Sequence, residues 1–568
     1  MIDLFFTYFK ILANYSFLYI FLFFQGRAFL LVLNRLLIKE KKLPTKILEI
    51  KASILYPIVG IVYVGNILVI TNFFIKLNSG ISYSVIFLTL LPNFLDITKK
   101  RIEISLNQFI YYLFIPAVLL VSSSDINFHY DAGYYHLNHQ NWLRESNIIL
   151  GMTNIFWPFG ISSIYEYLSA MLWTSKSLVN IHYLSVVFIH FLYSFLFFNL
   201  FESKNLKFRN ASLLLIIFSI LDNFGYSGGR NGFIYIQEVA KQDISLSILI
   251  IFLSLVILYQ LSKKKIKEID ITLIPLFSLF ILQIKVSGVI IFYLTFLFIL
   301  YLLFNKITSL NRILFLNVPS IFLGLVWLLK NYLISGCFIY PLSITCINSF
   351  AWFSKSDVIK VENYTTETSY SFMQYFLSEN LKFNDWIFDF FNSFGVFSEY
   401  YKSFYTNFFI SFLLICTLAL LIFQVDKNSK FILFSIFSYL LTYTTYIIFY
   451  GPIPRYSIGL LSIFIMTVTF FIKEPRVQFP LMLKLGAFTL SLVLLPRINS
   501  YINLYENKNI SLHYPVEEIQ EITNLSKILW HKPSDGDQCW IDISCRNEDG
   551  GLTFKETFIF KTANKIDI

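Results

Sequence analysis

The stretch ISLSILIIFLSLVILYQL, residues 244–261, is an apolar run without a single Asp, Glu, Lys or Arg. A run of about 20 apolar residues is long enough to cross a bilayer as an α-helix. Comparable runs recur along the chain and predict an all-α polytopic integral membrane protein with about 12–14 transmembrane helices. We expect the spans at 4–24, 52–76, 81–95, 108–123, 180–201, 210–222, 244–261, 270–284, 287–304, 312–334, 407–424, 431–450, 455–472 and 480–496.

The composition excludes a soluble multidomain protein. Of the 568 residues, 56% are hydrophobic and only 14% are charged, whereas roughly a quarter of the residues in soluble domains are charged. The first segment, MIDLFFTYFKILANYSFLYIFLFF, has no small-residue cleavage site and holds Lys10 inside its apolar run. We therefore expect it to remain as a membrane helix and not to be cleaved as a signal peptide.

The formal net charge of +10 comes from Lys and Arg in short loops between the apolar runs. Every second loop is basic, and basic loops face the cytoplasm. The pattern therefore reports topology in the cytoplasmic membrane and argues against a nucleic-acid-binding face. The basic loops are Arg27–Lys51, Lys99–Arg101, Lys204–Arg209, Lys263–Lys267, Lys306–Arg312, Lys427–Lys430 and Lys473–Arg476, and the segments expected outside are 124–179, 223–243, a turn at Lys285, 335–406, 451–454 and 497–568.

This topology divides the chain into a transmembrane domain, 1–496, and a C-terminal outer tail, 497–568. The long outer loops of the domain are 124–179 and 335–406. The tail ends in LTFKETFIF, where apolar and polar residues alternate, and this predicts a small folded appendage.

Four cysteines fall in segments expected outside the membrane. Cys337 and Cys346 share one outer loop, and Cys539 and Cys545 share the tail. Disulfides persist on the outer side of the cytoplasmic membrane, so either pair can be bonded. Four unpaired thiols remain the alternative.

The first outer loop concentrates acidic and histidine residues in DINFHYDAGYYHLNHQNWLRE, 125–145. A carboxylate just outside a span can act as a general base on a hydroxyl group. Asp131 is the first candidate and Asp125 the second. A helix N-cap is the alternative role for Asp131, because Asp is a preferred residue at that position.

The same loop predicts two amphipathic helices, 132–146 and 161–174, which lie along the outer interface and frame a cavity. Tyr135, His139 and Trp142 share one face of the first helix. Binding of a divalent metal is an alternative role for part of this loop. The spacing of the possible ligands matches no standard zinc motif, so we expect no cofactor. The metal ligands would be His129, Asp131, His136 and His139.

Cationic residues near the outer ends of spans are candidates for phosphate binding. Arg455, in GPIPRYSIG at 451–459, can bind phosphate bidentately, or can be an arginine that reaches from the interface toward water. Lys285 lies between two apolar runs. An ionisable residue inside the membrane costs free energy and therefore points to function. The alternative is that Lys285 lies in an outer turn. Further candidates for glycan or phosphate contact are Arg230, Lys241 and Asp243.

The long first outer loop with its motif FHYDAGYYH, 128–136, and the later outer PRY element resemble the GT-C superfamily of membrane glycosyltransferases. Three longer stretches are similar to a bacterial family of GT-C-like envelope proteins. They are DAGYYHLNHQNWLRE at 131–145, KNYLISGCFIYP at 330–341 and GDQCW…C at 536–545.

The resemblance implies a sugar donor on polyprenyl phosphate, a glycan or lipid acceptor at the outer face, and an acidic residue of the first outer loop that assists attack at the anomeric carbon. Asp131 occupies the matching position, with Tyr135 and His136 nearby as substrate contacts. Many members carry two acidic residues there, whereas Tyr130 and Ala132 flank Asp131 in this chain. Which Asp is essential stays open, as does whether the site binds glycan without turning it over.

Two other functions compete with sugar transfer. A polysaccharide polymerase or ligase predicts that outer arginines matter more than Asp131. A flippase of lipid-linked sugar predicts charges along a path through the membrane, but the spans hold few besides Lys285, and the sequence has no internal repeat. The chain lacks a P-loop, a dinucleotide fingerprint, HExxH and a nucleophile elbow, which removes the corresponding enzyme classes.

Overall fold

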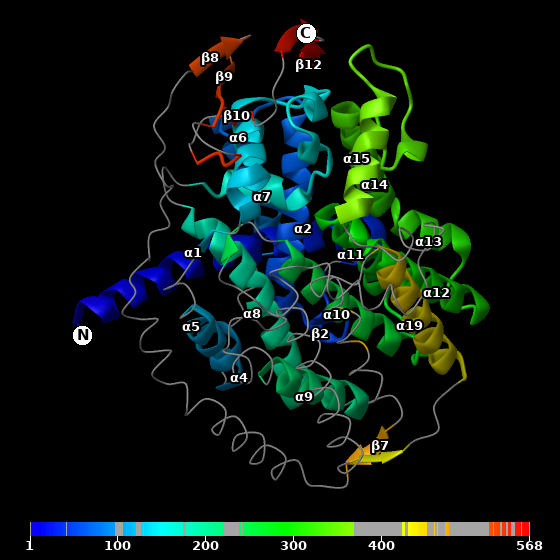
Figure 1. Cartoon of the computed structure of the whole chain (residues 1–568). Helices are drawn as coiled ribbons and strands as arrows, with labels where there is room; N and C mark the ends of the chain where they lie inside the picture. Colours follow the sequence, from blue (N-terminus) through cyan, green and yellow to red (C-terminus); the bar gives the residue numbers. More distant parts are fainter. Residues whose placement is uncertain are drawn as a thin grey trace, which may run out of the picture.

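The computed structural model describes the chain in segments, most of them helical (Figure 1). The described residues are 2–40, 42–96, 106–120, 127–128, 130–173, 178–203, 205–220, 238–239, 242–368, 423–425, 430–450, 459, 463, 472–475, 522–525, 528–533, 537–540, 544–546, 551–557 and 559–566.

The described helices and strands have the following bounds. The helices are α1 (Ile2–Leu33), α2 (Ala52–Asn72), α3 (Gly80–Leu88), α4 (Leu106–Phe109), α5 (Ile115–Leu119), α6 (Leu137–Glu145), α7 (Ile164–Met171), α8 (Val179–Glu202), α9 (Leu206–Ile220), α10 (Asp243–Gln260), α11 (Glu268–Ile284), α12 (Ile291–Phe304), α13 (Leu310–Leu316), α14 (Val318–Ser335), α15 (Lys355–Thr368) and α19 (Lys430–Tyr450). The strands are β1 (Lys46–Ile47), β2 (Ile50–Lys51), β3 (Asn127–Phe128), β4 (Ile149–Leu150), β5 (Glu238–Val239), β6 (Phe423–Val425), β7 (Ile472–Pro475), β8 (Ile522–Leu525), β9 (Ile528–His531), β10 (Ser544–Cys545), β11 (Gly551–Thr557) and β12 (Phe560–Ile566).

Six helices within the described residues are long and apolar enough to cross a membrane. Several of them also expose large apolar side chains, such as Phe17 at 76% and Leu325 at 61%, which is the pattern of a lipid-facing surface. These features are those of a polytopic membrane protein. The six are Tyr8–Ile38, Ala52–Asn72, Val179–Glu202, Asp243–Gln260, Val286–Phe304 and Val318–Ser335.

Several of the expected spans are formed by short helices. The span expected at 81–95 contains α3, whose nine residues cover about 14 Å of a hydrocarbon core about 30 Å thick. The spans expected at 108–123, 210–222 and 270–284 correspond to α4–α5, α9 and α11, which are also short. The span expected at 480–496 and most of the spans expected at 407–424 and 455–472 lie outside the described residues. The end of 407–424 belongs to the strand β6 and not to a helix.

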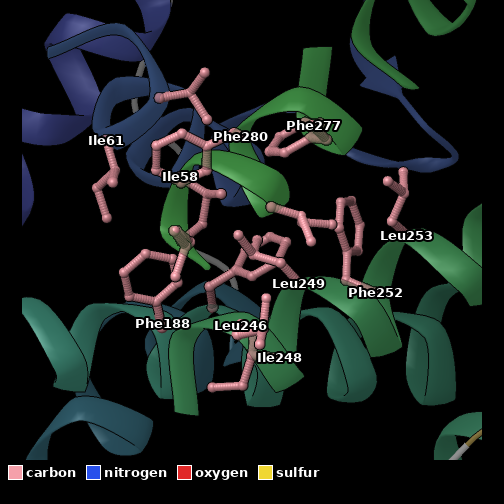
Figure 2. Close-up of a cluster of buried hydrophobic side chains, with 14 of the residues drawn as sticks. Ile58, Ile61, Phe188, Leu246, Ile248, Leu249, Phe252, Leu253, Phe277 and Phe280 are labelled. Atoms are coloured by element: carbon pink, nitrogen blue, oxygen red, sulfur yellow. The ribbon is translucent and has the colours of Figure 1, made fainter. Parts of the chain in front are cut away.

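The core of the bundle surrounds α10, in whose apolar stretch 94% of the residues are buried. Phe252 of α10 packs edge-on against Phe191 and Phe195 of α8, with ring centroids 4.9 and 5.1 Å away. It meets Phe277 of α11 in the same way at 5.7 Å. Figure 2 shows this cluster, to which α2 adds Ile58 and Ile61.

Helices α1 and α2 cross with their backbones in contact. An ideal Cβ atom on Gly26 would overlap the carbonyl oxygen of Tyr56, and one on Gly60 would overlap the carbonyl oxygen of Leu22. Small residues allow such close approach between helices in membranes. The two glycines therefore set the distance between α1 and α2.

Residues of three basic loops, 27–51, 263–267 and 306–312, meet at one end of the bundle. Helices α10 and α11 are antiparallel, because Gln260 bonds Asp270 at one end and Asp243 bonds Lys285 at the other. The first end gathers residues of the basic loops, with Lys267 Nζ donating to the carbonyl oxygen of Lys46 at 2.8 Å. The positive-inside rule predicts that this end faces the cytoplasm. We call the opposite end the outer end.

The tail folds as β structure and docks at the outer end. Strands β11 and β12 form an antiparallel hairpin over 551–566, in agreement with the alternating pattern. Strand β12 pairs in parallel with β4 of the first outer loop, Lys561 opposite Ile149. A second sheet has the order β10–β9–β8. The expected appendage is therefore packed on the first outer loop and does not stand apart from it (Figure 1).

Candidate functional site

The first outer loop forms two short helices at the outer end. The first begins with a π-helical turn, Ala132–His136, and continues as α6. The π-helical turn is rare and occurs frequently at functional sites. The second helix is α7.

These two helices differ from the predicted amphipathic pair because they are buried on all sides. Every residue from Leu137 to Leu143 is buried, and so is every residue from Ile164 to Ala170. The tail covers part of α6, with Trp142 Nε1 donating to the carbonyl oxygen of Cys545 at 3.0 Å. His136, Gln140 and Glu166, which an amphipathic pattern would place in water, are instead hydrogen-bonded inside the protein.

The carboxylate of Glu166 is the centre of this buried polar cluster, and its residue is only 2% exposed. His136 Nδ1 lies 2.5 Å from Glu166 Oε1. Gln140 Nε2 donates to Oε2 at 2.7 Å, and Gln242 Nε2 donates to Oε1 at 2.6 Å. Trp173 Nε1 completes the network by donating to Gln140 Oε1 at 2.7 Å. A carboxylate with this many partners is held in one position, because a buried charge is tolerated only when it is paired.

The Glu166 cluster continues into an ion pair between transmembrane helices. Gln242 directly precedes Asp243 at the start of α10, and Lys285 Nζ lies 2.7 Å from Asp243 Oδ1. The side chain of Lys285 is 23% exposed and that of Asp243 is 9% exposed. Lys285 follows α11 directly and so lies in the turn at the outer end, as one of the two readings of this residue predicted.

Asp131 lies one helical turn before His136, at the partly exposed start of the same helical stretch. Its side chain makes no capping hydrogen bond to the π-helical turn that it precedes, so an N-cap role does not account for it. The neighbouring Tyr130 hydroxyl donates to Asp537 of the tail. This hydrogen bond raises the pKa of Tyr130. The tail thus brings a second carboxylate close to Asp131.

The tail reaches this position because residue 133 is a glycine. An ideal Cβ atom on Gly133 would lie 2.6 Å from the ring of Trp540. The amide of Cys539 donates to the carbonyl oxygen of Gly133 at 2.9 Å. The structure bonds Cys539 to Cys545, so a disulfide closes the segment that covers the helix.

A lysine and a histidine are buried beside the Glu166 cluster. Lys330 of α14 is fully buried, and its Nζ atom lies 3.6 Å from the ring centroid of Trp327. His139 stacks on Phe159 at 5.0 Å between ring centroids. Neither Lys330 Nζ nor His139 Nε2 has a hydrogen-bond partner among the described residues. Burial, with the charges of Lys330 and His136, lowers the pKa of His139 to about 3.

Acidification is expected to destabilise the protein through His139. The unfolded chain binds a proton at this residue near a pKa of about 6.5, whereas the folded protein keeps the ring neutral down to about 3. Because the unfolded state binds more protons between these values, stability is complete above about pH 6.5 and falls by up to roughly 1.4 kcal/mol per pH unit below it. The apparent melting temperature of the solubilised protein should fall on acidification.

His139→Phe is the matched variant for this measurement, because it retains a ring against Phe159 but does not titrate. We expect its melting temperature to fall less steeply with pH than that of the wild type. Equal slopes would show that His139 accepts a proton in the folded protein.

The structure brings together four of the candidate residues from the sequence. His136, Asp243 and Lys285 belong to one connected cluster, and the ring of Tyr135 lies 4.2 Å from that of His136 between centroids. Asp131 begins the helical stretch that carries His136. The other candidates, Asp125, Arg230, Lys241 and Arg455, lie outside the described residues, as does His129.

Sequence reasoning missed two charged residues of the site. Lys330 belongs to the stretch KNYLISGCFIYP but received no role of its own. It lies inside an apolar helix, where an ionisable residue points to function. Glu166 had the same signal, since it lies in the apolar stretch Ile164–Met171. Gln140, Trp173 and Gln242 carried no signal of this kind.

The part of the chain that the structure describes contains no group of three or more His, Cys, Asp or Glu residues placed to hold a metal ion. Asp131, His136 and His139 are the described residues among the four possible metal ligands, and the two histidines have other partners. His136 bonds Glu166, and His139 stacks on Phe159.

A family model described as a domain of unknown function, DUF8201, matches residues 9–462. The chain belongs to the DUF8201 family. No curated protein and no solved structure matches it. The DUF8201 match includes the Glu166 cluster, the Asp243–Lys285 pair and Lys330 but ends before the docked tail, so Asp537 and the Cys539–Cys545 disulfide lie outside the matched region.

Proposed function

We propose that this DUF8201 protein is a GT-C-type glycosyltransferase that works at the outer face of the cytoplasmic membrane. It transfers a sugar from a polyprenyl-phosphate donor in the bilayer to a glycan or lipid acceptor of the cell envelope. The observation that carries the proposal is the connected cluster of ionisable residues at the outer end. There His136 and Glu166 of the first outer loop meet Asp243 and Lys285 of the membrane helices.

Asp131 is the proposed general base. It is partly exposed, whereas Glu166 is buried and its carboxylate is already bonded by three side chains. Asp131 takes the proton of an acceptor hydroxyl as the hydroxyl oxygen attacks the anomeric carbon. The bond between that carbon and the donor phosphate oxygen breaks, and the polyprenyl phosphate leaves with the electron pair.

The other residues bind the donor and hold the base in place. Lys285 follows α11 at the outer end, and its ammonium group can stabilise the charge on the leaving phosphate. The Glu166 network holds His136 and the π-helical turn, and thereby the position of Asp131. These are positioning roles.

The experiment is an envelope-glycan profile by mass spectrometry in cells that carry the wild type, a deletion or Asp131→Asn, with membrane levels of the variant checked. We expect the deletion to remove one sugar from a defined glycan. Asp131→Asn should reduce that product at least about 100-fold at normal protein level, because a positioned base contributes about 10²–10⁴ to the rate.

Two results would overturn the proposal in different ways. A wild-type profile for Asp131→Asn would remove Asp131 from catalysis. If Arg455→Ala shortened or abolished a polymer in the same cells, a polymerase or ligase would replace the transferase.

A further inference from the structure

A cavity, which we call the outer pocket, lies at the outer end. It is separate from the Glu166 cluster. Its volume is about 180 Å³. The first outer loop, the segment after α14 and the tail all contribute to its lining. Four aromatic side chains, Trp157, Tyr340, Trp352 and Phe353, share this lining with three charged side chains, Asp357, Lys360 and Lys565.

Two of these aromatic rings lie against glycines of the first outer loop. An ideal Cβ atom on Gly151 would lie 2.8 Å from the ring of Trp352, and one on Gly160 would lie 2.6 Å from the ring of Tyr340. Gly151 also has a φ of +69°, which a side chain disfavours. The absence of side chains at Gly151 and Gly160 therefore leaves room for these two rings.

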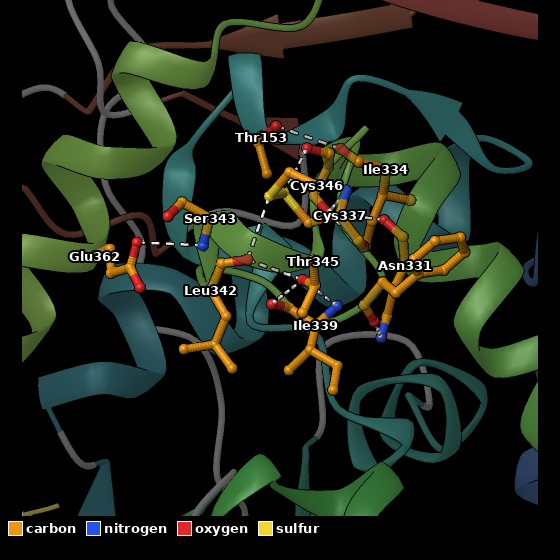
Figure 3. Close-up of a disulfide and its surroundings, with 12 residues drawn as sticks. Thr153, Asn331, Ile334, Cys337, Ile339, Leu342, Ser343, Thr345, Cys346 and Glu362 are labelled. Atoms are coloured by element: carbon orange, nitrogen blue, oxygen red, sulfur yellow. Dashed lines mark hydrogen bonds between the residues drawn. A yellow bond between two sulfur atoms is a disulfide. The ribbon is translucent and has the colours of Figure 1, made fainter. Parts of the chain in front are cut away.

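A disulfide closes the loop that carries Tyr340. Cys337 is bonded to Cys346, and Figure 3 shows the surrounding hydrogen bonds. Thr345 Oγ1 bonds both the amide and the carbonyl group of Ile339 at 3.1 and 3.0 Å. Thr153 Oγ1 attaches the first outer loop to α14 by donating to the carbonyl oxygen of Ile334 at 3.3 Å. A wall held in this way loses little entropy when a ligand binds.

The charged side chains form a mixed rim and not a uniformly basic one. Lys360 Nζ lies 3.7 Å from Asp357 Oδ1, and the two side chains are 80% and 44% exposed. The carboxylate of Asp357 accepts hydrogen bonds from hydroxyl groups and repels anions, whereas Lys360 and Lys565 donate hydrogen bonds. This combination favours a neutral ligand that carries several hydroxyl groups.

The size of the outer pocket restricts the ligand further. Sites for drug-sized molecules measure roughly 300–1,000 Å³, so a cavity of about 180 Å³ suits a ligand of one ring. A sugar ring combines apolar C–H groups, which pack against aromatic side chains, with hydroxyl groups at its edge. We propose that the outer pocket binds one neutral pyranose ring of the acceptor glycan. The role as acceptor rests on the proposed function, whereas sugar binding itself does not.

The test is hydroxyl-radical footprinting of the purified full chain in detergent, read by mass spectrometry at each tryptophan. The probes are the methyl pyranosides of glucose, galactose, mannose and N-acetylglucosamine, with inorganic phosphate as a further probe. At about ten times the dissociation constant, at least one sugar should lower oxidation of Trp157 and Trp352 about tenfold. Trp540, which packs on Gly133 outside the outer pocket, should be oxidised as before.

Variants decide whether the rim takes part in binding. Asp357→Asn removes the charge at nearly constant shape and should weaken binding of the protecting sugar about tenfold, because a hydrogen bond to a charged group is stronger than one to a neutral group. Glu145→Gln is the matched control, because Glu145 is an exposed carboxylate at the outer end that does not line this pocket. It should bind the sugar as the wild type does.

Four results would overturn the inference, three of which concern the sugars and the variant. These three are no protection by any sugar, equal protection of Trp540, and wild-type binding by Asp357→Asn. Protection by phosphate in place of sugar would also overturn it and would point to an anion site. No donor is present in this test, so protection without transferase activity in cells would reject the proposed function and leave the sugar site standing.

Discussion

Replacing Gly60 by alanine is expected to disrupt the packing of α1 against α2 and to lower the amount of protein in the membrane severely. The added methyl group would overlap the carbonyl oxygen of Leu22, which belongs to the backbone and cannot rotate away as a side chain can. Overpacking in a core typically costs 1–3 kcal/mol, and we expect a loss of stability of about 3 kcal/mol, since the two helix axes must move apart. Membrane level and apparent melting temperature in detergent measure the effect.

Gly80→Ala is the matched control for this prediction. Gly80 begins α3, and an ideal Cβ atom there meets nothing within 4 Å. Alanine favours a helix over glycine by up to about 1 kcal/mol, so this variant should be as stable as the wild type or slightly more stable. If Gly60→Ala behaved like Gly80→Ala, the close crossing of α1 and α2 would not exist in the membrane.

Glu166→Ala is expected to unfold the outer-end site and to abolish the glycan product. The change leaves three buried side chains, His136, Gln140 and Gln242, without the carboxylate that accepts their hydrogen bonds. Removing one partner from a buried charged network costs about 3–5 kcal/mol, because the remaining polar groups stay buried and unpaired. We expect a loss of about 4 kcal/mol in stability, seen as a lower melting temperature, with the sugar missing from the envelope glycan.

Glu145→Ala separates this effect from the loss of any glutamate at the outer end. Glu145 lies 3.5 Å from Lys76, and both side chains are at least 40% exposed. An exposed ion pair contributes little, so the variant should differ from the wild type by no more than about 0.5 kcal/mol and should retain the product. A Glu166→Ala protein of wild-type stability would mean that the buried cluster does not hold the helices of the first outer loop.

The proposed chemistry depends on the packing that holds Asp131 in position. Asp131 is partly exposed and is held by a helical stretch that carries the buried polar residues His136 and Gln140. The site therefore depends on residues that never contact substrate, such as Glu166. For this reason the Asp131→Asn variant, which should retain the fold, is the appropriate test of catalysis, and the Glu166→Ala variant is the test of positioning.

Sequence patterns predicted the local features of this chain well. The apolar run 244–261 corresponds to α10 within one residue at each end. The alternation in LTFKETFIF predicted a small folded appendage, and strands β11 and β12 form a hairpin there. Residues of the basic loops 27–51, 263–267 and 306–312 meet at one end of the bundle, and the side of the membrane that this end faces stays a prediction. Each of these features depends on residues close together in the chain, and periodicity and charge are local properties.

The sequence alone therefore determined a helical membrane protein with a segment, 124–179, that is rich in ionisable groups. Only the tertiary structure decided that Glu166 and not water satisfies His136 and Gln140, and that the tail brings Asp537 to Tyr130 across 407 positions. Only packing showed that Gly26 and Gly60 meet. The physical reason is that the partner of a buried polar group or of a contacting glycine can lie anywhere in the chain. Partners far apart in the chain produce no periodic pattern in the sequence.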